Sequence, residues 1–134
     1  MENTKDPLAS LFTDDAKATN REQLASLVVP FIKLVKDSKE FEFLPAFSKL
    51  KDNPSKIEIL LAAVKARALF LNEPDGLAPS EIIATQILPE GSVKSAVKGL
   101  FDGHKIKKDK DGKKYILPPY RIPELTEKFI NAKP

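Results

Sequence analysis

Residues 91–117 read GSVKSAVKGLFDGHKIKKDKDGKKYIL, where a helical pattern runs directly into the pattern of a β-hairpin. Its apolar side chains recur at the i, i+3, i+4, i+7 and i+8 spacing that forms one stripe of an α-helix, and they are Val93, Ala96, Val97, Leu100 and Phe101. Gly103 is expected to end the helix in the left-handed conformation, and Asp111-Gly112 is a favoured pair for a tight turn. The stretch therefore predicts a helix over 91–102 and a hairpin over 105–117.

Two more helices are predicted before this stretch. A capping box at residues 55–58 opens a long helix over 55–71 that is apolar around most of its circumference. Leu77 is then expected to form a short extended bridge, and Pro79 suits the first position of a helix over 79–88. A short break separates that helix from the next one. Helix, short turn and helix is the arrangement of a helix-turn-helix.

Three segments in this half of the chain carry a resemblance to a known fold. They are Leu77-Ala78-Pro79-Ser80-Glu81-Ile82-Ile83, Gly91-Ser92-Val93-Lys94-Ser95-Ala96-Val97-Lys98-Gly99-Leu100, and Gly103-His104-Lys105-Ile106 leading to Asp111-Gly112-Lys113-Lys114-Tyr115. Together with helix 55–71 they resemble the winged helix-turn-helix superfamily, though no particular family within it. The resemblance implies a mainly α fold with a small β-hairpin (α+β), and a domain over 55–119. Members commonly place the second helix of the pair in the DNA major groove and the wing against the backbone or minor groove.

Residues 1–54 are predicted to form an N-terminal helical extension. The sequence Thr19-Asn20-Arg21-Glu22 has the form of a capping box, so a helix should begin there, kink or restart at Pro30 and end over 36–40. Pro45 is expected to begin a short helix among crowded phenylalanines, which are Phe41, Phe43 and Phe47. This extension and helix 55–71 together offer apolar surface for a homodimer contact.

The two chain ends are expected to carry little structure. Residues 1–18 are predicted to be a frayed end or a short turn of helix, in which Asp14 and Asp15 face solvent and have no catalytic role. Residues 120–134 are predicted to form a short helix that starts near Pro123 and then frays.

Charge is distributed unevenly along the chain. Residues 1–90 hold 11 Lys/Arg and 14 Asp/Glu, a net −3, whereas residues 91–122 hold 9 and 3, a net +6. A local concentration of positive charge attracts polyanions. The same segment contains the predicted second helix and the wing, so these two elements are the candidate binding surface.

The candidate DNA-binding residues lie on the outward side of helix 91–102 and along the wing. They are Ser92, Lys94, Ser95, Lys98, Lys105, Lys107, Lys108, Lys110, Lys113 and Lys114. Lysines contact phosphates or guanine acceptors, and serines tolerate close approach. The helix face has no Arg, Asn or Gln, the residue types that bind base edges in bidentate fashion, so we expect modest sequence specificity or a role for shape.

Each of these features also has a purely structural interpretation. A lysine-rich hairpin can simply be a solvated edge that resists sheet-to-sheet aggregation. His104 is expected to cap the helix or face solvent. Tyr115, Ile106 and Leu117 share one strand face by alternation, which favours a core position beneath the wing over base stacking by Tyr115.

Composition removes several classes of function. The chain has no cysteine and one histidine, which excludes disulfides, thiolate metal sites and histidine-rich metal sites. It has no nucleophile–base pair and no glycine-rich phosphate loop, so we expect neither an enzyme nor a cofactor. Without a signal peptide or a long apolar run, a cytoplasmic protein with no membrane partner is expected.

Two functions fit these observations. The first is a DNA-binding protein, either a small transcriptional regulator or a DNA-associated accessory factor, with double-stranded DNA as partner and RNA left open because phosphate attraction does not distinguish the two. The second is a winged-helix protein-interaction module in a larger assembly, which would dock through helix 55–71 and the phenylalanine cluster.

Overall fold

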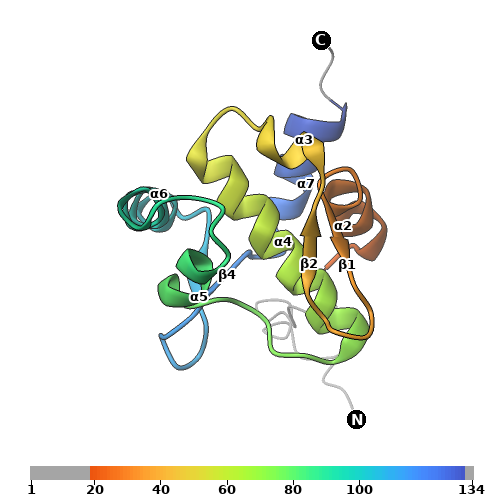
Figure 1. The fold of residues 1–134 in the computed structure, drawn as a ribbon, viewed down its shortest axis with the longest axis horizontal. Helices are drawn as coiled ribbons and strands as arrows, with labels where there is room; N and C mark the ends of the chain where they lie inside the picture. Colours follow the sequence, from red (N-terminus) through yellow and green to blue (C-terminus); the bar gives the residue numbers. More distant parts are fainter. Residues whose placement is uncertain (1–18, 132–134) are drawn as a thin grey trace, which may run out of the picture.

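The computed structural model describes residues 19–131, which are mainly helical with two small antiparallel hairpins (Figure 1). In chain order the elements are α2 (Arg21–Val28), β1 (Ile32–Leu34), β2 (Phe41–Phe43), α3 (Pro45–Ser48), α4 (Asn53–Leu71), α5 (Pro79–Ala84), α6 (Glu90–Asp102), β3 (Lys107–Lys108), β4 (Tyr115–Ile116), α7 (Arg121–Thr126) and a π-helical turn (Glu127–Asn131). The expectations for residues 1–18, including Asp14 and Asp15, and for residues 132–134 lie outside the described part.

Helix α4 runs through the middle of the molecule, with α5 and α6 on one side and α2 and the β1–β2 hairpin on the other (Figure 1). Its apolar side chains point in all directions, and most of them are fully buried: Ile57, Ile59, Leu60, Leu61, Ala62, Ala63 and Val64. A helix that is apolar around its circumference must be covered on several sides. The prediction of a long, widely covered helix is confirmed, and here the cover comes from the same chain.

The prediction of a helix continuing past Pro30 is wrong. Helix α2 ends at Val28, and the chain then forms the β1–β2 hairpin, in which Ile32 pairs with Phe43 and Leu34 with Phe41. Proline provides no backbone N–H for a helix, and the segments on both sides of the turn are rich in aromatic and aliphatic residues that favour strands. The short helix predicted from Pro45 is confirmed as α3.

Both predicted capping boxes are displaced. The cap of α2 is Asn20, whose side chain accepts a hydrogen bond from the Gln23 amide, at 3.0 Å. The cap of α4 is Asp52, whose carboxylate accepts from the Ser55 amide, at 2.8 Å. Asn is a better cap than Thr, and Asp52 caps as well as Ser55 would while placing Pro54 in the first turn, where a proline is tolerated.

The ends of α5 and α6 also differ from expectation. Helix α5 stops at Ala84, before the predicted end at residue 88, and Gln86 then adopts a positive φ of 62°. Gly103 keeps a φ of −86°, so its predicted left-handed conformation is wrong. The left-handed residue is His104, with φ of 61°.

The wing is joined to the helical part by the residues before α5. The Leu77 amide donates to the Tyr115 carbonyl at 3.0 Å, and the Tyr115 amide donates back at 2.8 Å, which confirms the predicted extended bridge. Gly76 precedes this bridge with φ of 86°, and a Cβ there would lie 2.6 Å from a methyl group of Ile116. Only glycine combines that conformation with so close an approach.

The C-terminal helix closes the other side of the core. Helix α7 and the π-helical turn pack against α2, and the ring of Phe129 meets the ring of Phe31 edge to face at 6.1 Å between centroids. Ile122 and Leu125 are fully buried in the same cluster as residues of α2 and α4. The predicted short C-terminal helix is confirmed.

Candidate nucleic-acid interface

Helix α6 is held by an apolar stripe that packs against α4 and α5. Val93, Ala96, Val97 and Leu100 are all buried, as the spacing predicted. Phe101, the fifth predicted member of the stripe, is different because its side chain lies at the edge of the stripe and is 38% exposed. The opposite side of α6 faces solvent and carries the candidate residues.

Both lysines on α6 are engaged in ion pairs within the helix. Lys94 Nζ lies 2.9 Å from a carboxylate oxygen of Glu90, and Lys98 Nζ donates to Asp102 at the same distance. The hydrogen bond from Lys94 lowers the pKa of the Glu90 carboxyl, and the bond to Asp102 raises the pKa of the Lys98 ammonium. The exposed side of α6 thus carries two positive and two negative charges, a net charge of zero.

The two serines face a different surface from the lysines. Ser92 and Ser95, with Gly91 and Gly99, line a shallow hollow between α6 and the start of α4 at Asn53. The predicted face of Ser92, Lys94, Ser95 and Lys98 is therefore divided. The serines border the hollow, and the lysine side chains lie at 64% and 78% exposure.

The wing is the β3–β4 hairpin with a loop at its end. Lys107 pairs with Ile116 and Lys108 with Tyr115, and the Asp109 carboxylate accepts hydrogen bonds from the amides of Lys113 and Lys114 at 3.2 and 3.3 Å. Gly112 has φ of 72°, as a tight turn at Asp111-Gly112 requires. The predicted hairpin is confirmed, and Asp109 is a structural residue of its loop.

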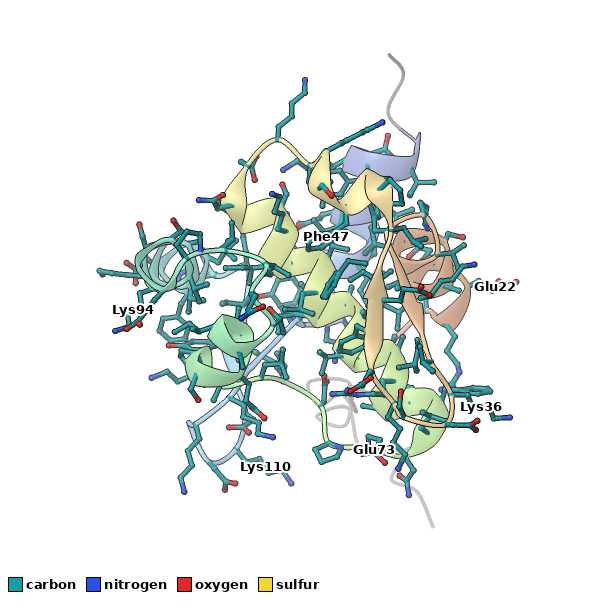
Figure 2. All side chains as sticks on the ribbon, in the orientation of Figure 1. Glu22, Lys36, Phe47, Glu73, Lys94 and Lys110 are labelled. Atoms are coloured by element: carbon teal, nitrogen blue, oxygen red, sulfur yellow. The ribbon has the colours of Figure 1, made fainter. Side chains whose placement is uncertain are left out.

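Most wing lysines point into solvent. Lys105, Lys108, Lys110 and Lys113 are exposed, whereas Lys107 and Lys114 are half-buried and Lys114 Nζ lies 3.9 Å from Glu81 on α5. Lys110 on the wing and Lys94 on α6 lie on one side of the molecule, and Glu22 and Lys36 lie on the other (Figure 2). Residues 105–114 hold six lysines and two aspartates. The wing thus carries the net positive charge of the candidate surface.

An aromatic pair connects the wing to α6. The rings of Phe101 and Tyr115 meet edge to face with centroids 5.6 Å apart, and the Lys108 ammonium lies 5.3 Å from the Phe101 centroid and 5.8 Å from that of Tyr115. Ile106 and Leu117 are buried beneath the wing as predicted, but Tyr115 is only half-buried. Sequence reasoning assigned Phe101 to the core because its spacing fits the apolar stripe.

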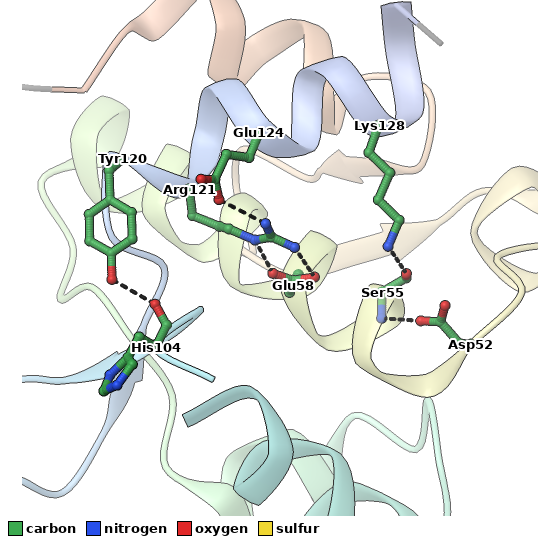
Figure 3. A network of polar contacts seen from close by, with 8 residues as sticks. All are labelled: Asp52, Ser55, Glu58, His104, Tyr120, Arg121, Glu124 and Lys128. Atoms are coloured by element: carbon green, nitrogen blue, oxygen red, sulfur yellow. Dashed lines mark hydrogen bonds and ion pairs between the residues drawn. The ribbon is translucent and has the colours of Figure 1, made fainter. Parts of the chain in front are cut away.

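The backbone groups of His104 form hydrogen bonds at the end of α6. Its amide donates to the Phe101 carbonyl at 3.1 Å, and its own carbonyl accepts from the Tyr120 hydroxyl at 2.7 Å (Figure 3). The residue is exposed, which fits the expected capping or solvent position. The link to Tyr120 fixes the start of the wing to the segment just before α7.

A buried ion pair fixes α7 to α4 beneath this region (Figure 3). Arg121 Nε donates to Glu58 Oε2 at 2.6 Å and a terminal nitrogen donates to Oε1 at 3.3 Å, while Glu124 accepts from the other terminal nitrogen at 2.8 Å. The Glu58 and Arg121 side chains are only 2% and 11% exposed. Glu58 is thus a buried partner of Arg121, and its predicted capping role is wrong.

Comparisons with known proteins add no assignment. The chain matches no protein-family model, no curated protein and no solved structure. Over residues 19–131, no helix combines the length and apolar character needed to cross a membrane, and no group of three or more His, Asp or Glu side chains is placed to hold a metal ion.

Proposed function

We propose that the chain is a nucleic-acid-binding protein of the winged helix-turn-helix kind, with duplex DNA as its partner. The observation that supports this proposal best is the arrangement of α4, the Leu77 bridge, α5, α6 and the β3–β4 hairpin, in which the bridge pairs one residue before α5 with β4 of the wing. This is the element order of a winged helix. A role as a small transcriptional regulator or DNA-associated accessory factor is part of the same proposal.

In this proposal the wing and helix α6 contact different parts of the duplex. The four exposed wing lysines contact phosphates, because they reach into solvent and the wing holds more lysines than carboxylates. Helix α6 lies in the major groove, and its lysines exchange their partners Glu90 and Asp102 for phosphate or guanine acceptors. Exposed ion pairs contribute little free energy in water, so this exchange is inexpensive.

The test is the affinity for duplex DNA as a function of salt. With about four phosphate contacts, the logarithm of the association constant should fall against the logarithm of salt with a slope of roughly −4. The variant K110E/K113E should weaken binding and flatten the slope by about 0.9 for each phosphate that the wing no longer reaches. Fluorescence anisotropy with a labelled duplex measures both quantities.

The matched control is K36E/K49E, which makes the same charge change on exposed lysines of the β1–β2 turn and the end of α3. This control should retain most of the affinity. No duplex binding at low salt, or equal losses in the two variants, would contradict the proposal. A preference for double-stranded RNA over DNA would keep the interface and change the partner.

A protein-interaction module is the second candidate, and one observation favours it. Phe70 at the end of α4 is 72% exposed and borders a small apolar groove lined by Leu24, Ala25, Ala66 and Leu69. The larger docking surface expected for this function is not accessible, because most of α4 and Phe47 are buried and Phe41 and Phe43 are half-buried. The same limit applies to the homodimer predicted through these elements.

Light scattering tests whether the Phe70 surface binds a second copy of the chain. If Phe70 mediates self-association, Phe70→Ser should lower the measured mass and leave duplex binding unchanged. A monomeric wild-type chain that binds DNA supports the first function and contradicts self-association through Phe70.

A further inference from the structure

Phe101 occupies the junction between α6 and the wing, and its ring is part of the surface. Leu100 and Val97 fill the core side of this helical turn, so Phe101 is not required to complete the stripe. Its ring contacts Tyr115 on β4 and lies beneath the ammonium of Lys108. A partly exposed aromatic ring with a lysine ammonium over it is therefore placed between the two elements that we assign to nucleic acid.

This combination has a known chemical use. Proteins that bind single-stranded nucleic acid join a positively charged groove, which follows the phosphates, with aromatic rings on which bases stack. A base inside a duplex has both faces covered by its neighbours, so only an unpaired or terminal base can stack on a protein ring. Stacking is tolerant of sequence because every base has a π-face, which suits a surface without Arg, Asn or Gln on the exposed side of α6.

We propose that Phe101 is a stacking platform for an unpaired base, so that the α6–wing surface binds single-stranded nucleic acid in addition to duplex. This inference rests on the proposed function, since it uses the same phosphate-binding lysines. The Lys108 ammonium occupies the ring face in the free protein. A base displaces it, and the flexible lysine side chain then reaches the phosphate beside that base.

The experiment compares a short oligothymidylate with a duplex of equal length whose terminal base pairs are covered by stacked aromatic caps, both fluorescently labelled. Phe101→Leu keeps apolar volume but removes the aromatic face. It should weaken binding of the single strand on the order of tenfold while changing duplex affinity less than about twofold. Phe101→Tyr restores an aromatic face and should restore single-strand affinity.

A matched control and a direct readout keep the proposal falsifiable. Phe70→Leu makes the same substitution at an exposed phenylalanine near α2, and it should change neither affinity. A 2-aminopurine base in the single strand should lose fluorescence on binding to wild-type protein and not to Phe101→Leu. Equal losses for single strand and duplex, or no loss for either, would overturn the stacking role alone. If wild-type protein binds neither oligonucleotide at low salt, the proposed function fails as well.

Discussion

Among single residues, Glu58 and Arg121 form an ion pair in surroundings that tolerate little change. Both side chains are nearly inaccessible to water. Glu58 lies on α4 and Arg121 on α7, and the two residues are 63 positions apart in the sequence. Removal of one partner from a buried pair leaves an uncompensated charge, which costs more than the pair itself contributes. Replacing one of the two residues should therefore destabilise the fold more than replacing both.

We expect Arg121→Met to lower the free energy of unfolding by about 3–5 kcal/mol, because it leaves the Glu58 carboxylate buried and unpaired. The double variant E58L/R121M should be considerably closer to wild type, since it removes both charges. Urea unfolding followed by circular dichroism measures these differences. Glu124→Gln serves as the control, because Glu124 is exposed and bonds to the same guanidinium. A loss below about 1 kcal/mol for Arg121→Met would contradict the argument.

A second prediction concerns Asp52, the cap of α4. Hydrogen bonds from the side chain and the backbone amide of Ser55 lower the pKa of the Asp52 carboxyl below its ordinary value of 3.8. The carboxylate therefore stabilises the fold above that value, and the contribution is lost as the pH falls through the lower pKa of the folded state. We expect Asp52→Ala to cost about 1 kcal/mol near neutral pH and less in acid.

Unfolding curves of wild type and Asp52→Ala at neutral and acidic pH test this prediction. Asp52→Asn is the matched variant, because asparagine caps a helix well but does not titrate. A difference between wild type and Asp52→Ala that grows in acid would show that the sign is wrong.

At the scale of elements, α6 and the wing differ in the net charge of their exposed surfaces. The wing has a net positive charge, whereas the exposed side of α6 is neutral because its two lysines pair with Glu90 and Asp102. Both elements belong to the most basic part of the sequence, yet residue counts alone did not distinguish them. Both pairs have the i, i+4 spacing of a helix, but Glu90 lies outside the predicted helix 91–102, and α6 in fact begins at that residue.

We expect E90Q/D102N to bind duplex DNA more tightly than wild type, because the change frees two ammonium groups on the proposed groove side of α6. The salt slope should become steeper by up to about 0.9 for each additional phosphate that is bound. Anisotropy titrations over a range of salt concentrations measure both effects. The control E22Q/E127Q removes the same charge from exposed residues of α2 and the π-helical turn, and it should change the affinity less. If the two variants behave alike, α6 does not contact the duplex.

At the scale of the whole molecule, local periodicity predicted the long elements and missed the contacts between distant ones. Helices α4, α6 and α7 and the wing follow from the spacing of apolar residues and from Asp111-Gly112. The β1–β2 hairpin was missed because the pattern after Pro30 fits a restarted helix as well as a short strand. The pairing of Glu58 with Arg121 has no local signal, since it depends on how α7 packs against α4.

The candidate site was predictable to a similar extent. The charge distribution along the chain identified α6 and the wing as the candidate surface. Which of their side chains are exposed and which are buried or engaged in contacts was not predicted. Ser92 and Ser95 border a hollow, Asp109 organises the wing loop, and Phe101 emerges at the surface. These outcomes depend on the angle at which α6 lies on α4 and on the wing beside it, which no residue pattern specifies.

The Leu77 bridge has a consequence for binding thermodynamics. A hairpin with two paired residues in each strand is marginal by itself in water, and ordering it on contact with a ligand would cost conformational entropy. The two hydrogen bonds to Leu77 and the close approach of Gly76 to Ile116 hold β4 against the helical core before any ligand arrives. Such preorganisation leaves more of the interaction free energy available as affinity.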